Sequence, residues 1–243
     1  YGIGYDVIDV DAATKRGIKV CNSPTHCLDE VATHTIAMIL AMERQLVFFN
    51  DLVKEGKWLA NAGFKPHRLS CQTLGFVGFG NIARRTADFA KGFGFRMVAY
   101  DPYLDESIIT ASGAEKVELD ELLAVSDVIT IHTPLFESTY HLINKDTIAK
   151  MKDGVMIVNT SRGPIISADD LMAAVKEGKV RAAALDVVEH EPISEPGHPL
   201  FETGKIICSP HAAYNSVEAE KQMMAVLAAT AVDTLNGKNP DNI

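Results

Sequence analysis

The chain has 243 residues, of which 47% are hydrophobic and 23% are charged, and its formal net charge is −9. This length is enough for one large α/β domain or two smaller ones with a buried core. No run of Lys and Arg stands out, and no apolar stretch approaches the ~18 residues of a membrane span, so we expect neither a nucleic-acid partner nor a membrane location. The four cysteines form no Cys-x-x-Cys pair, which indicates free thiols and a cytoplasmic location.

The first part of the chain predicts helices before any sheet. Residues 11–16 predict a short helix that leads into a strand at 17–22. Residues 29–56 contain no Gly or Pro before their last position, and their apolar side chains recur near helical spacing, which predicts one long helix or a bent pair. A loop follows at 63–70. Because the chain starts with Tyr1 rather than Met, we expect it to be a fragment that lacks an N-terminal portion.

From Leu74 onward, apolar runs alternate with helical stretches. The predicted strands lie at 74–79, 96–100, 128–132, 155–159, 181–187 and 205–208. The predicted helices lie at 81–92, 118–125, 144–151, 168–177 and 216–235. Apolar runs separated by helices are typical of a buried parallel sheet built from βαβ units. We therefore predict an α/β fold with a doubly wound parallel-sheet Rossmann domain.

A glycine-rich loop follows the first strand of this alternating region. Residues 78–83 have the pattern Gly-x-Gly-x-x-Ala, a permitted variant of the dinucleotide-binding fingerprint, and they open the next helix. Gly78 would permit the tight turn. Gly80 would let the backbone approach a pyrophosphate at the helix N-terminus. The loop predicts a dinucleotide cofactor, which implies hydride chemistry if the residues of a reaction centre follow it.

Asp101 ends the next predicted strand, 21 residues after Gly80. This spacing is that of the acidic residue that binds the ribose 2′-hydroxyl in dinucleotide-binding domains. The alternative interpretation of Asp101 is a solvated turn carboxylate before Pro102. A carboxylate here would repel a 2′-phosphate, so the sequence favours NAD over NADP.

Three side chains downstream of the loop could hold a 2-oxo acid and give it a proton. Arg162 can form two hydrogen bonds with a carboxylate, His211 can donate a proton near neutral pH, and Glu191 would favour the protonated imidazole. The alternative interpretation of Arg162 is a surface charge. That of His211 is a capping or core imidazole, and that of Glu191 is an exposed turn carboxylate. The other histidines predict surface, cap or core positions, with His132 at a strand end as a candidate to line the cleft. No spacing of His, Cys and Asp resembles a metal site.

Six stretches of the chain together resemble the D-isomer-specific 2-hydroxyacid dehydrogenase family. This family includes phosphoglycerate, glycerate and formate dehydrogenases and the C-terminal-binding-protein co-repressors. The matching stretches are 2–6, 75–83, 159–163, 184–187, 190–192 and 209–214. The likeness covers essentially the whole chain, and residues 100–103 and 211–214 most resemble the branch that contains the co-repressors and their bacterial relatives.

The resemblance implies a role for each residue of the predicted reaction centre. Arg162 would bind the carboxylate and carbonyl of the substrate, Glu191 would hydrogen-bond His211, and His211 would act as the general acid in reduction and the base in oxidation. The positions implied to contact NAD are Gly78, Gly80, Asn81, Ile82, Asp101, Thr133, Thr160, Ser161, Arg162, Asp186, His211 and Ala213. The positions implied to contact a small 2-oxo or 2-hydroxy acid are Ile3, Gly4, Arg162 and Tyr214.

The resemblance also implies the domain organisation. An incomplete, flavodoxin-like substrate domain would comprise residues 1–24 and 217–243, and the NAD-binding Rossmann domain would comprise residues 25–216. Relatives dimerise through the region of the long helical segment 29–56, so we expect a homodimer.

Two other functions are compatible with a Rossmann fold. An NADH-sensing interaction scaffold, as in the co-repressor branch, would need a peptide-binding groove in an N-terminal portion. A methyltransferase that uses Asp101 to bind S-adenosylmethionine would leave Arg162, Glu191 and His211 without a role. The sequence therefore favours an oxidoreductase that interconverts a 2-oxo acid and a D-2-hydroxy acid.

Overall fold

A computed structural model of the chain describes residues 2–238, which form two compact units. The larger unit comprises Val31–Ala213, and the smaller unit comprises the described residues of the segments Tyr1–Glu30 and Tyr214–Ile243. The smaller unit is discontinuous in sequence, because it combines the segments that precede and follow the larger unit.

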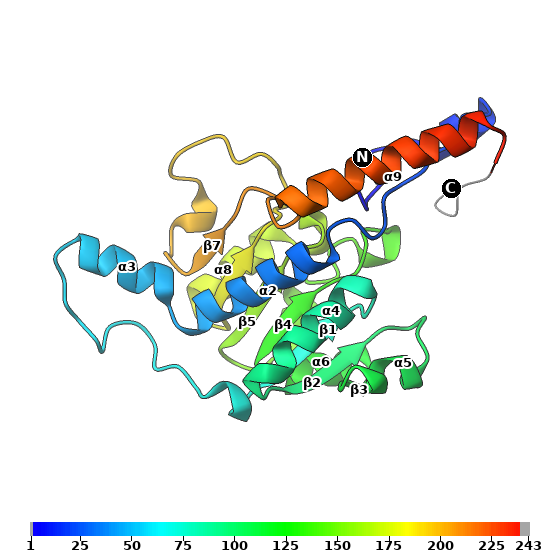
Figure 1. Cartoon of the computed structure of the whole chain (residues 1–243). Helices are drawn as coiled ribbons and strands as arrows, with labels where there is room; N and C mark the ends of the chain where they lie inside the picture. The colour runs from blue at the N-terminus through cyan, green and yellow to red at the C-terminus, as the bar shows by residue number, and fades with distance from the viewer. Residues whose placement is uncertain (1, 239–243) are drawn as a thin grey trace. The chain divides into compact units, whose positions relative to one another are not determined.

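The larger unit is built on a seven-stranded parallel sheet (Figure 1) with the strand order β3-β2-β1-β4-β5-β6-β7. The strands are β1 Thr73–Val77, β2 Arg96–Tyr100, β3 Glu115–Lys116, β4 Val128–Ile131, β5 Val155–Asn159, β6 Val180–Leu185 and β7 Ile206–Cys208. The order reverses at β1, which pairs with both β2 and β4. This is the doubly wound arrangement, so the predicted Rossmann fold is confirmed.

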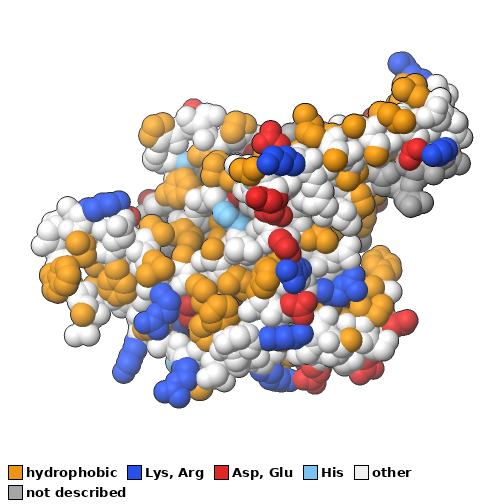
Figure 2. Space-filling view, in the orientation of Figure 1, with side chains coloured by type: hydrophobic (Ala, Val, Ile, Leu, Met, Phe, Trp, Pro, Cys, Tyr) orange, Lys and Arg blue, Asp and Glu red, His pale blue; other side chains and the backbone are white. Residues whose placement is uncertain are grey.

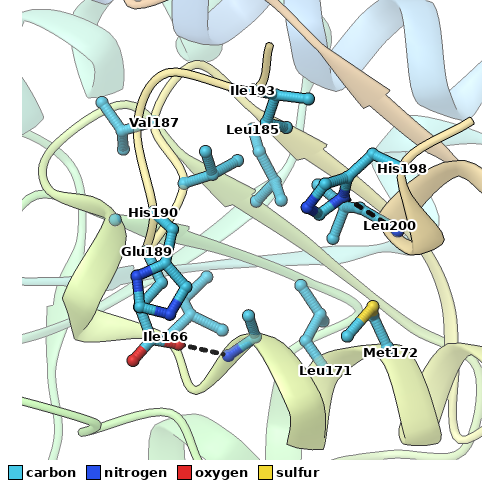
Figure 3. Close-up of a pocket in the computed structure, with 13 residues that line it drawn as sticks. Ile166, Leu171, Met172, Leu185, Val187, Glu189, His190, Ile193, His198 and Leu200 are labelled. Carbon is cyan, nitrogen blue, oxygen red and sulfur yellow. Dashed lines mark hydrogen bonds between the residues drawn. The ribbon is translucent and has the colours of Figure 1, made fainter. Parts of the chain in front are cut away.

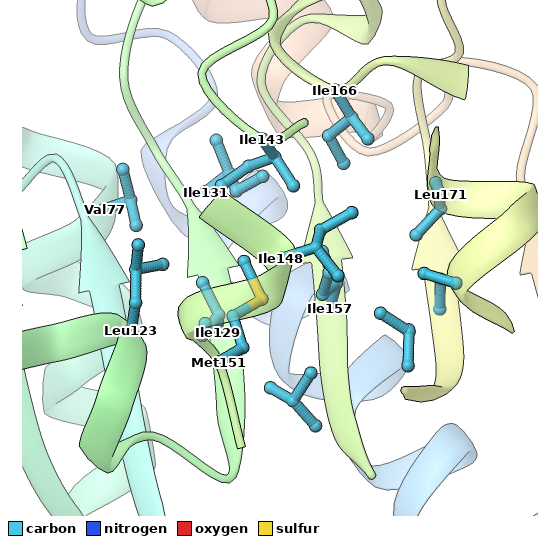
Figure 4. Close-up of a cluster of buried hydrophobic side chains, with 14 of the residues drawn as sticks. Val77, Leu123, Ile129, Ile131, Ile143, Ile148, Met151, Ile157, Ile166 and Leu171 are labelled. Carbon is cyan, nitrogen blue, oxygen red and sulfur yellow. The ribbon is translucent and has the colours of Figure 1, made fainter. Parts of the chain in front are cut away.

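The central strands are apolar throughout because both faces of the sheet are covered. Successive side chains of a strand point to opposite faces. On β5, Ile157 packs into one core cluster with helices α6 (Leu119–Val125), α7 (Lys145–Lys150) and α8 (Ala168–Glu177), as Figure 4 shows. Met156 and Val158 pack into the other cluster with α2 (Leu28–Glu43), α4 (Asn81–Ala90) and α5 (Glu106–Ala111). Burial on both sides explains the continuous apolar runs, which an antiparallel sheet with one wet face would not require.

The helices of the larger unit are α2 Leu28–Glu43, whose first turn lies in the smaller unit, α3 Leu46–Lys54, α4 Asn81–Ala90, α5 Glu106–Ala111, α6 Leu119–Val125, α7 Lys145–Lys150 and α8 Ala168–Glu177. All of them except α3 contribute residues to the core clusters on the two faces of the sheet, and α3 buries no residue. Short 3₁₀ turns lie at Leu69–Cys71, Lys91–Phe93, Glu137–Thr139, Gly163–Ile165 and Pro199–Phe201. The sequence predicts the ends of α8 well, because Ser167 caps its first turn and Gly178 ends it with φ 86°.

The segment 29–56, predicted to be one long helix or a bent pair, forms two helices. Helix α2 ends at Glu43, and Gln45 adopts a left-handed conformation with φ 51° before α3 begins. The Gln45 side chain donates to the carbonyl of Phe64 at 2.7 Å and accepts the N–H of Phe64 at 3.0 Å. These two bonds to a distant loop stabilise the break between the helices.

The smaller unit contains two helices in its described part, α1 Val10–Lys15 and α9 Val217–Leu235. Ser216 caps α9, because its Oγ accepts the N–H of Ala219 at 2.9 Å and donates to Glu30 Oε1 at 2.7 Å. The strand predicted at 17–22 is wrong: these residues are irregular, since no second strand lies beside them in the described part of this unit to form a ladder. The flavodoxin-like fold expected for the smaller unit stays a prediction. Among residues 2–238, the structure contains no helix with the length and hydropathy that a bilayer crossing requires.

Candidate active site

Polar groups follow the carboxyl ends of the strands of the sheet. Because all seven strands are parallel, these ends share one edge, where ligands bind in open α/β sheets. The glycine loop follows β1, Thr133 follows β4, and the Thr160–Arg162 segment follows β5. Asp186 follows β6 directly, and Ser209 follows β7. The sequence-predicted residues of the larger unit therefore lie along this edge or on the loops that leave it.

The glycine loop has a backbone that other residues would not reproduce. Gly78 has φ 83°, and a Cβ on it would lie 2.8 Å from the backbone nitrogen of Thr133, so the loops after β1 and β4 are in backbone contact there. Around Gly80, by contrast, a Cβ would meet nothing within 4 Å. No side chain caps α4, whose first N–H groups belong to Asn81 and Ile82. An open approach to uncapped helix N–H groups fits the pyrophosphate of a dinucleotide.

Asp101 is joined to the glycine loop. Its Oδ2 accepts the N–H of Phe79 at 2.9 Å, and its Oδ1 accepts the N–H of Tyr103 at 2.9 Å. The carboxylate therefore holds the loop between the two glycines in shape. The same contact places an acidic group beside the glycine turn, as recognition of an adenosine ribose requires.

His132 has a structural role in this part of the sheet. Its Nε2 lies 3.0 Å from Thr130 Oγ1, and its ring stacks on Phe76 with the ring centroids 5.9 Å apart. Burial of the ring lowers the pKa of His132 to about 3, so the imidazole is neutral at physiological pH. His132 therefore packs at the strand end as a neutral imidazole.

The loop that carries Arg162 is organised by Asn159, the fully buried last residue of β5. Asn159 Oδ1 accepts the N–H of Ser161 at 3.0 Å and its hydroxyl at 2.9 Å, and Asn159 Nδ2 donates to the carbonyl of Arg162 at 2.9 Å. Arg162 Nη1 donates to the carbonyl of Ser161 at 2.7 Å. On the other side of the loop, the hydroxyls of Thr160 and Thr35 are 2.9 Å apart. Asn159 was not predicted as a site residue, although an Asn that ends an apolar strand is a signal for such a support.

Asp186 supports the turn that carries His211. Its side chain is buried, and its Oδ1 accepts Ser209 Oγ at 2.5 Å and the N–H of Ala212 at 2.9 Å, while its Oδ2 accepts the N–H of Ala213 at 2.9 Å. The carbonyl of Asp186 accepts the N–H of His211 at 2.8 Å. His211 itself has φ 53°, which a non-glycine residue adopts only when its surroundings hold it there. The turn is thus folded around one buried carboxylate.

Ser209 also connects this turn to α2. His34 Nε2 is hydrogen-bonded to Ser209 Oγ at 2.8 Å and lies 3.6 Å from Asp186 Oδ1. The sequence reasoning did not include His34 or Ser209 in the site. A contact between α2 and the end of β7 depends on the tertiary fold, and only the position of Ser209 beside His211 could have indicated it.

Glu191 and His211 form the hydrogen-bonded pair at the centre of the candidate site. Glu191 Oε2 accepts from His211 Nδ1 at 2.9 Å, and Glu191 Oε1 accepts the N–H of Val188 at 3.0 Å. The His211 side chain is 46% exposed, so a substrate can reach the ring. With Nδ1 directed at a carboxylate, Nε2 is the ring nitrogen left for proton transfer.

Three predicted substrate positions belong to the other unit of the chain. Ile3, Gly4 and Tyr214 belong to the smaller unit, where the carbonyl of Ile3 accepts Asn22 Nδ2 at 2.9 Å and the Tyr214 side chain is exposed. Their contact with a substrate stays a prediction. Within residues 2–238, no cluster of three His, Cys, Asp or Glu side chains has the geometry of a metal site.

The chain is similar to known proteins over nearly its whole length. The chain is 39% identical over 245 residues to a hydroxypyruvate reductase of Blautia hydrogenotrophica, an alignment that covers 99% of this chain and 75% of that protein. It is 38% identical over 248 residues to a glyoxylate reductase of Korarchaeum cryptofilum, with 100% of this chain and 74% of the relative covered.

Solved structures give the same result. The structure is similar to that of D-lactate dehydrogenase from Aquifex aeolicus in complex with NAD and lactic acid, with a TM-score of 0.89, 32% identity, and 97% of this chain and 75% of that chain covered. Residues 36–213 match the sequence profile described as "D-isomer specific 2-hydroxyacid dehydrogenase, NAD binding domain". The predicted NAD cofactor is therefore confirmed, and the chain belongs to the D-isomer-specific 2-hydroxyacid dehydrogenase family.

Proposed function

We propose that the protein is an NAD-dependent oxidoreductase that reduces a small 2-oxo acid to its D-2-hydroxy acid, with His211 as the acid, Glu191 as its partner and Arg162 as the carboxylate-binding group. The observation that carries this proposal is the 2.9 Å hydrogen bond between Glu191 and His211 Nδ1, which leaves Nε2 for the substrate. An exposed imidazole oriented by a carboxylate has the geometry required of a general acid in carbonyl reduction.

When NADH is bound, it supplies the hydride that adds to the carbonyl carbon. The alkoxide formed on the carbonyl oxygen needs a proton, and the Nε2–H of the His211 imidazolium would provide it. Glu191 would stabilise the imidazolium before the transfer and hold the ring in place. The Arg162 guanidinium would bind the substrate carboxylate and stabilise the negative charge that develops on the oxygen.

The cofactor would be held mainly by backbone groups. Gly80 and the first N–H groups of α4 would receive the pyrophosphate, and Asp101 would accept the ribose 2′-hydroxyl. Thr133, the Thr160–Ser161 segment and the turn folded around Asp186 would line the nicotinamide end. Each of these contacts is a prediction. The geometry of the glycine loop supports the pyrophosphate contact of Gly80 and α4 and the ribose contact of Asp101.

Residues outside the larger unit would complete the substrate-binding site. We propose that the segments 1–24 and 217–243 contribute to a substrate domain, in which the backbone of Ile3 and Gly4 would contact the substrate carboxylate and Tyr214 its side chain. The names of the relatives suggest hydroxypyruvate and glyoxylate as the first substrates to try.

The test is the consumption of NADH, followed by its near-ultraviolet absorbance, with hydroxypyruvate, glyoxylate and pyruvate. We expect turnover on at least one of the three, a product of D configuration, and loss of turnover in His211→Gln. A protein that binds NADH but reduces none of the three acids would contradict the proposal and favour the sensing scaffold instead.

We also propose that the chain forms a homodimer through α3 and the loop after it. Figure 2 shows hydrophobic side chains over α3, and the exposed apolar residues of this region include Leu46, Val47, Trp58 and Leu59, with Trp58 86% exposed. Exposed apolar surface of this kind is typical of an interface. Sedimentation should give a dimer at micromolar concentration that Val47→Glu dissociates.

The four free thiols support a reducing compartment, which we propose to be the cytoplasm.

A further inference from the structure

His141 lies where the segment after β4 runs beside the loop that carries Arg162. Its N–H donates to the carbonyl of Pro164 at 2.9 Å, and two residues later Ile143 forms a parallel bridge with Ile166. His141 has φ 49°, so its backbone is held in the left-handed region that L-residues seldom adopt. The backbone of His141 is therefore fixed to the chain directly after Arg162.

The side chain of His141 points to a different loop, the one that carries Glu191. Glu189 Oε1 accepts from His141 Nε2 at 2.5 Å. Glu189 Oε2 accepts the N–H of Ala168 at 2.9 Å, the bond drawn as a dashed line at Glu189 in Figure 3. The Glu189 side chain is 13% exposed and lies at the edge of an apolar pocket formed by α8, the end of β6 and the following loop. Burial alone would raise the pKa of Glu189, but the bonds from Ala168 and His141 and the nearby His190 lower it in sum, so Glu189 is ionised at neutral pH.

The two loops also meet directly beside Arg162. A Cβ on Gly163 would lie 1.9 Å from the carbonyl oxygen of Val188 and 2.6 Å from the nitrogen of Glu189. Only a glycine lets the backbones approach this closely. The residue after Arg162 thus touches the backbone three residues before Glu191, and any change in this contact would move the two loops relative to each other.

Val188 connects Glu189 to the proton-transfer pair, because it directly precedes Glu189 and its N–H contacts Glu191. The N–H of Val188 donates to Glu191 Oε1 at 3.0 Å, and Glu191 Oε2 holds His211 Nδ1. A displaced Glu189 would move Val188, and Glu191 would lose the donor that fixes its carboxylate. The chain of contacts therefore runs from His141 through Glu189, Val188 and Glu191 to His211.

We propose that His141 and Glu189 form a clamp that sets the spacing between the loop carrying Arg162 and the loop carrying Glu191. In this role they are positioning residues for the reaction, and the catalytic consequence rests on the function proposed above. A purely structural role is the competing explanation, in which Glu189 would only satisfy the first N–H of α8. That helix has its own cap in Ser167 and needs Glu189 for one N–H alone.

The kinetic test is a double-mutant cycle of His141→Ala and Glu189→Ala in the full chain. Each single variant should lower kcat/KM for the 2-oxo acid by about tenfold with the loss mainly in kcat, and the double variant should be no worse than either, because both break one interaction. Glu189→Gln should retain most activity, since its amide can accept from Ala168 and pair with His141. The affinity for NADH should not change in any of them.

Glu115→Ala is the matched control, because it removes an exposed ion pair with Arg96, 2.8 Å long, at the far edge of the same sheet. It should leave kcat/KM unchanged. Additive losses in the double variant, or equal losses in kcat/KM and NADH affinity, would show a general structural defect and overturn the clamp.

A second measurement works without any turnover. Hydrogen exchange of the Val188 amide, followed by NMR, reports the bond to Glu191 directly. In Glu189→Ala and His141→Ala this amide should exchange at least about tenfold faster, while the amides of β1 keep their protection. Unchanged exchange would refute the clamp. Lack of turnover in the unmodified protein, with faster Val188 exchange in both variants, would instead refute the proposed function and leave the clamp standing.

Discussion

The two halves of the candidate site are built in different ways. The cofactor half is a local turn: Gly78, Gly80 and the start of α4 follow one another in the chain, and its main contacts are backbone groups. The reaction half is assembled from the loops after β5, β6 and β7, and side chains such as Asp186 and Glu191 hold those loops in place. The cofactor half is continuous in sequence and receives its distant support from Asp101 and Thr133, whereas the reaction half exists only where three separate loops meet.

This difference predicts how each half responds to mutation. A change in the glycine loop should act on cofactor binding or on the fold. A change among the reaction-half side chains should act on turnover and leave cofactor binding nearly intact.

The largest effect is expected at His211. His211→Gln removes the proton donor and should lower kcat by about 10²–10⁴-fold, the usual contribution of a general acid, while the affinity for NADH changes by less than about threefold. Stopped-flow reduction of hydroxypyruvate and fluorescence titration with NADH measure the two quantities. Glu191→Gln should lose less, because His211 remains. A large loss of NADH affinity with normal turnover would show that the two halves are not separate.

Arg162 tests whether the reaction half binds the substrate carboxylate. Arg162→Gln should lower kcat/KM by about 10–100-fold, since a charge-assisted bidentate contact is lost. Arg162→Lys should recover only part of this loss, because an ammonium group cannot form the same fork. A 2-oxo acid amide, which lacks the carboxylate charge, should react with the unmodified protein and with Arg162→Gln at similar rates. If the variant still discriminated strongly between acid and amide, another residue would be the carboxylate-binding group.

The two glycines of the cofactor half should separate stability from binding. Gly78→Ala places a Cβ 2.8 Å from Thr133 in a left-handed backbone, so we expect a loss of about 2–4 kcal/mol in the free energy of unfolding. Gly80→Ala meets no atom within 4 Å and has φ −67°, so stability should be unchanged, but its methyl group would obstruct the pyrophosphate and weaken NADH binding by about tenfold. Urea unfolding and NADH titration of both variants give the comparison. Equal effects at the two positions would contradict it.

The same contrast explains what the sequence could predict. The glycine loop, Asp101 and the partnership of Glu191 with His211 are short-range or motif-based patterns, and the sequence located them. The support by Asn159 and the contact of His34 with Ser209 depend on which loops become neighbours, which no periodicity encodes.

Two short elements, strand β3 and helix α5, were not predicted from the sequence. Strand β3 has two residues, too few for a periodic signal, and it exists because β2 offers it an edge. The strand expected at 17–22 had the right composition and no partner, which shows that a strand is defined by its neighbour as much as by its residues.

The smallest effect is expected at Glu43, a buried carboxyl at the end of α2 that belongs to neither half of the site. Burial raises the pKa of Glu43, a nearby Asp127 adds to this, and Gln72, Arg181 and His67 offset it only in part. Since the pKa is higher in the folded chain than in the unfolded one, the folded state favours the protonated form. This contribution to stability is present in acid and is lost as the pH rises through the folded-state pKa.

Glu43→Gln should therefore stabilise the protein at neutral and alkaline pH by roughly 1 kcal/mol, the scale of a buried polar group relieved of its charge, and the gain should vanish in acid. Thermal unfolding of both proteins across the pH range measures the difference. Turnover and NADH affinity should not change, because Glu43 contacts neither half. A gain that grew as the pH fell would mean that the folded state stabilises the carboxylate, and the sign of the shift would be wrong.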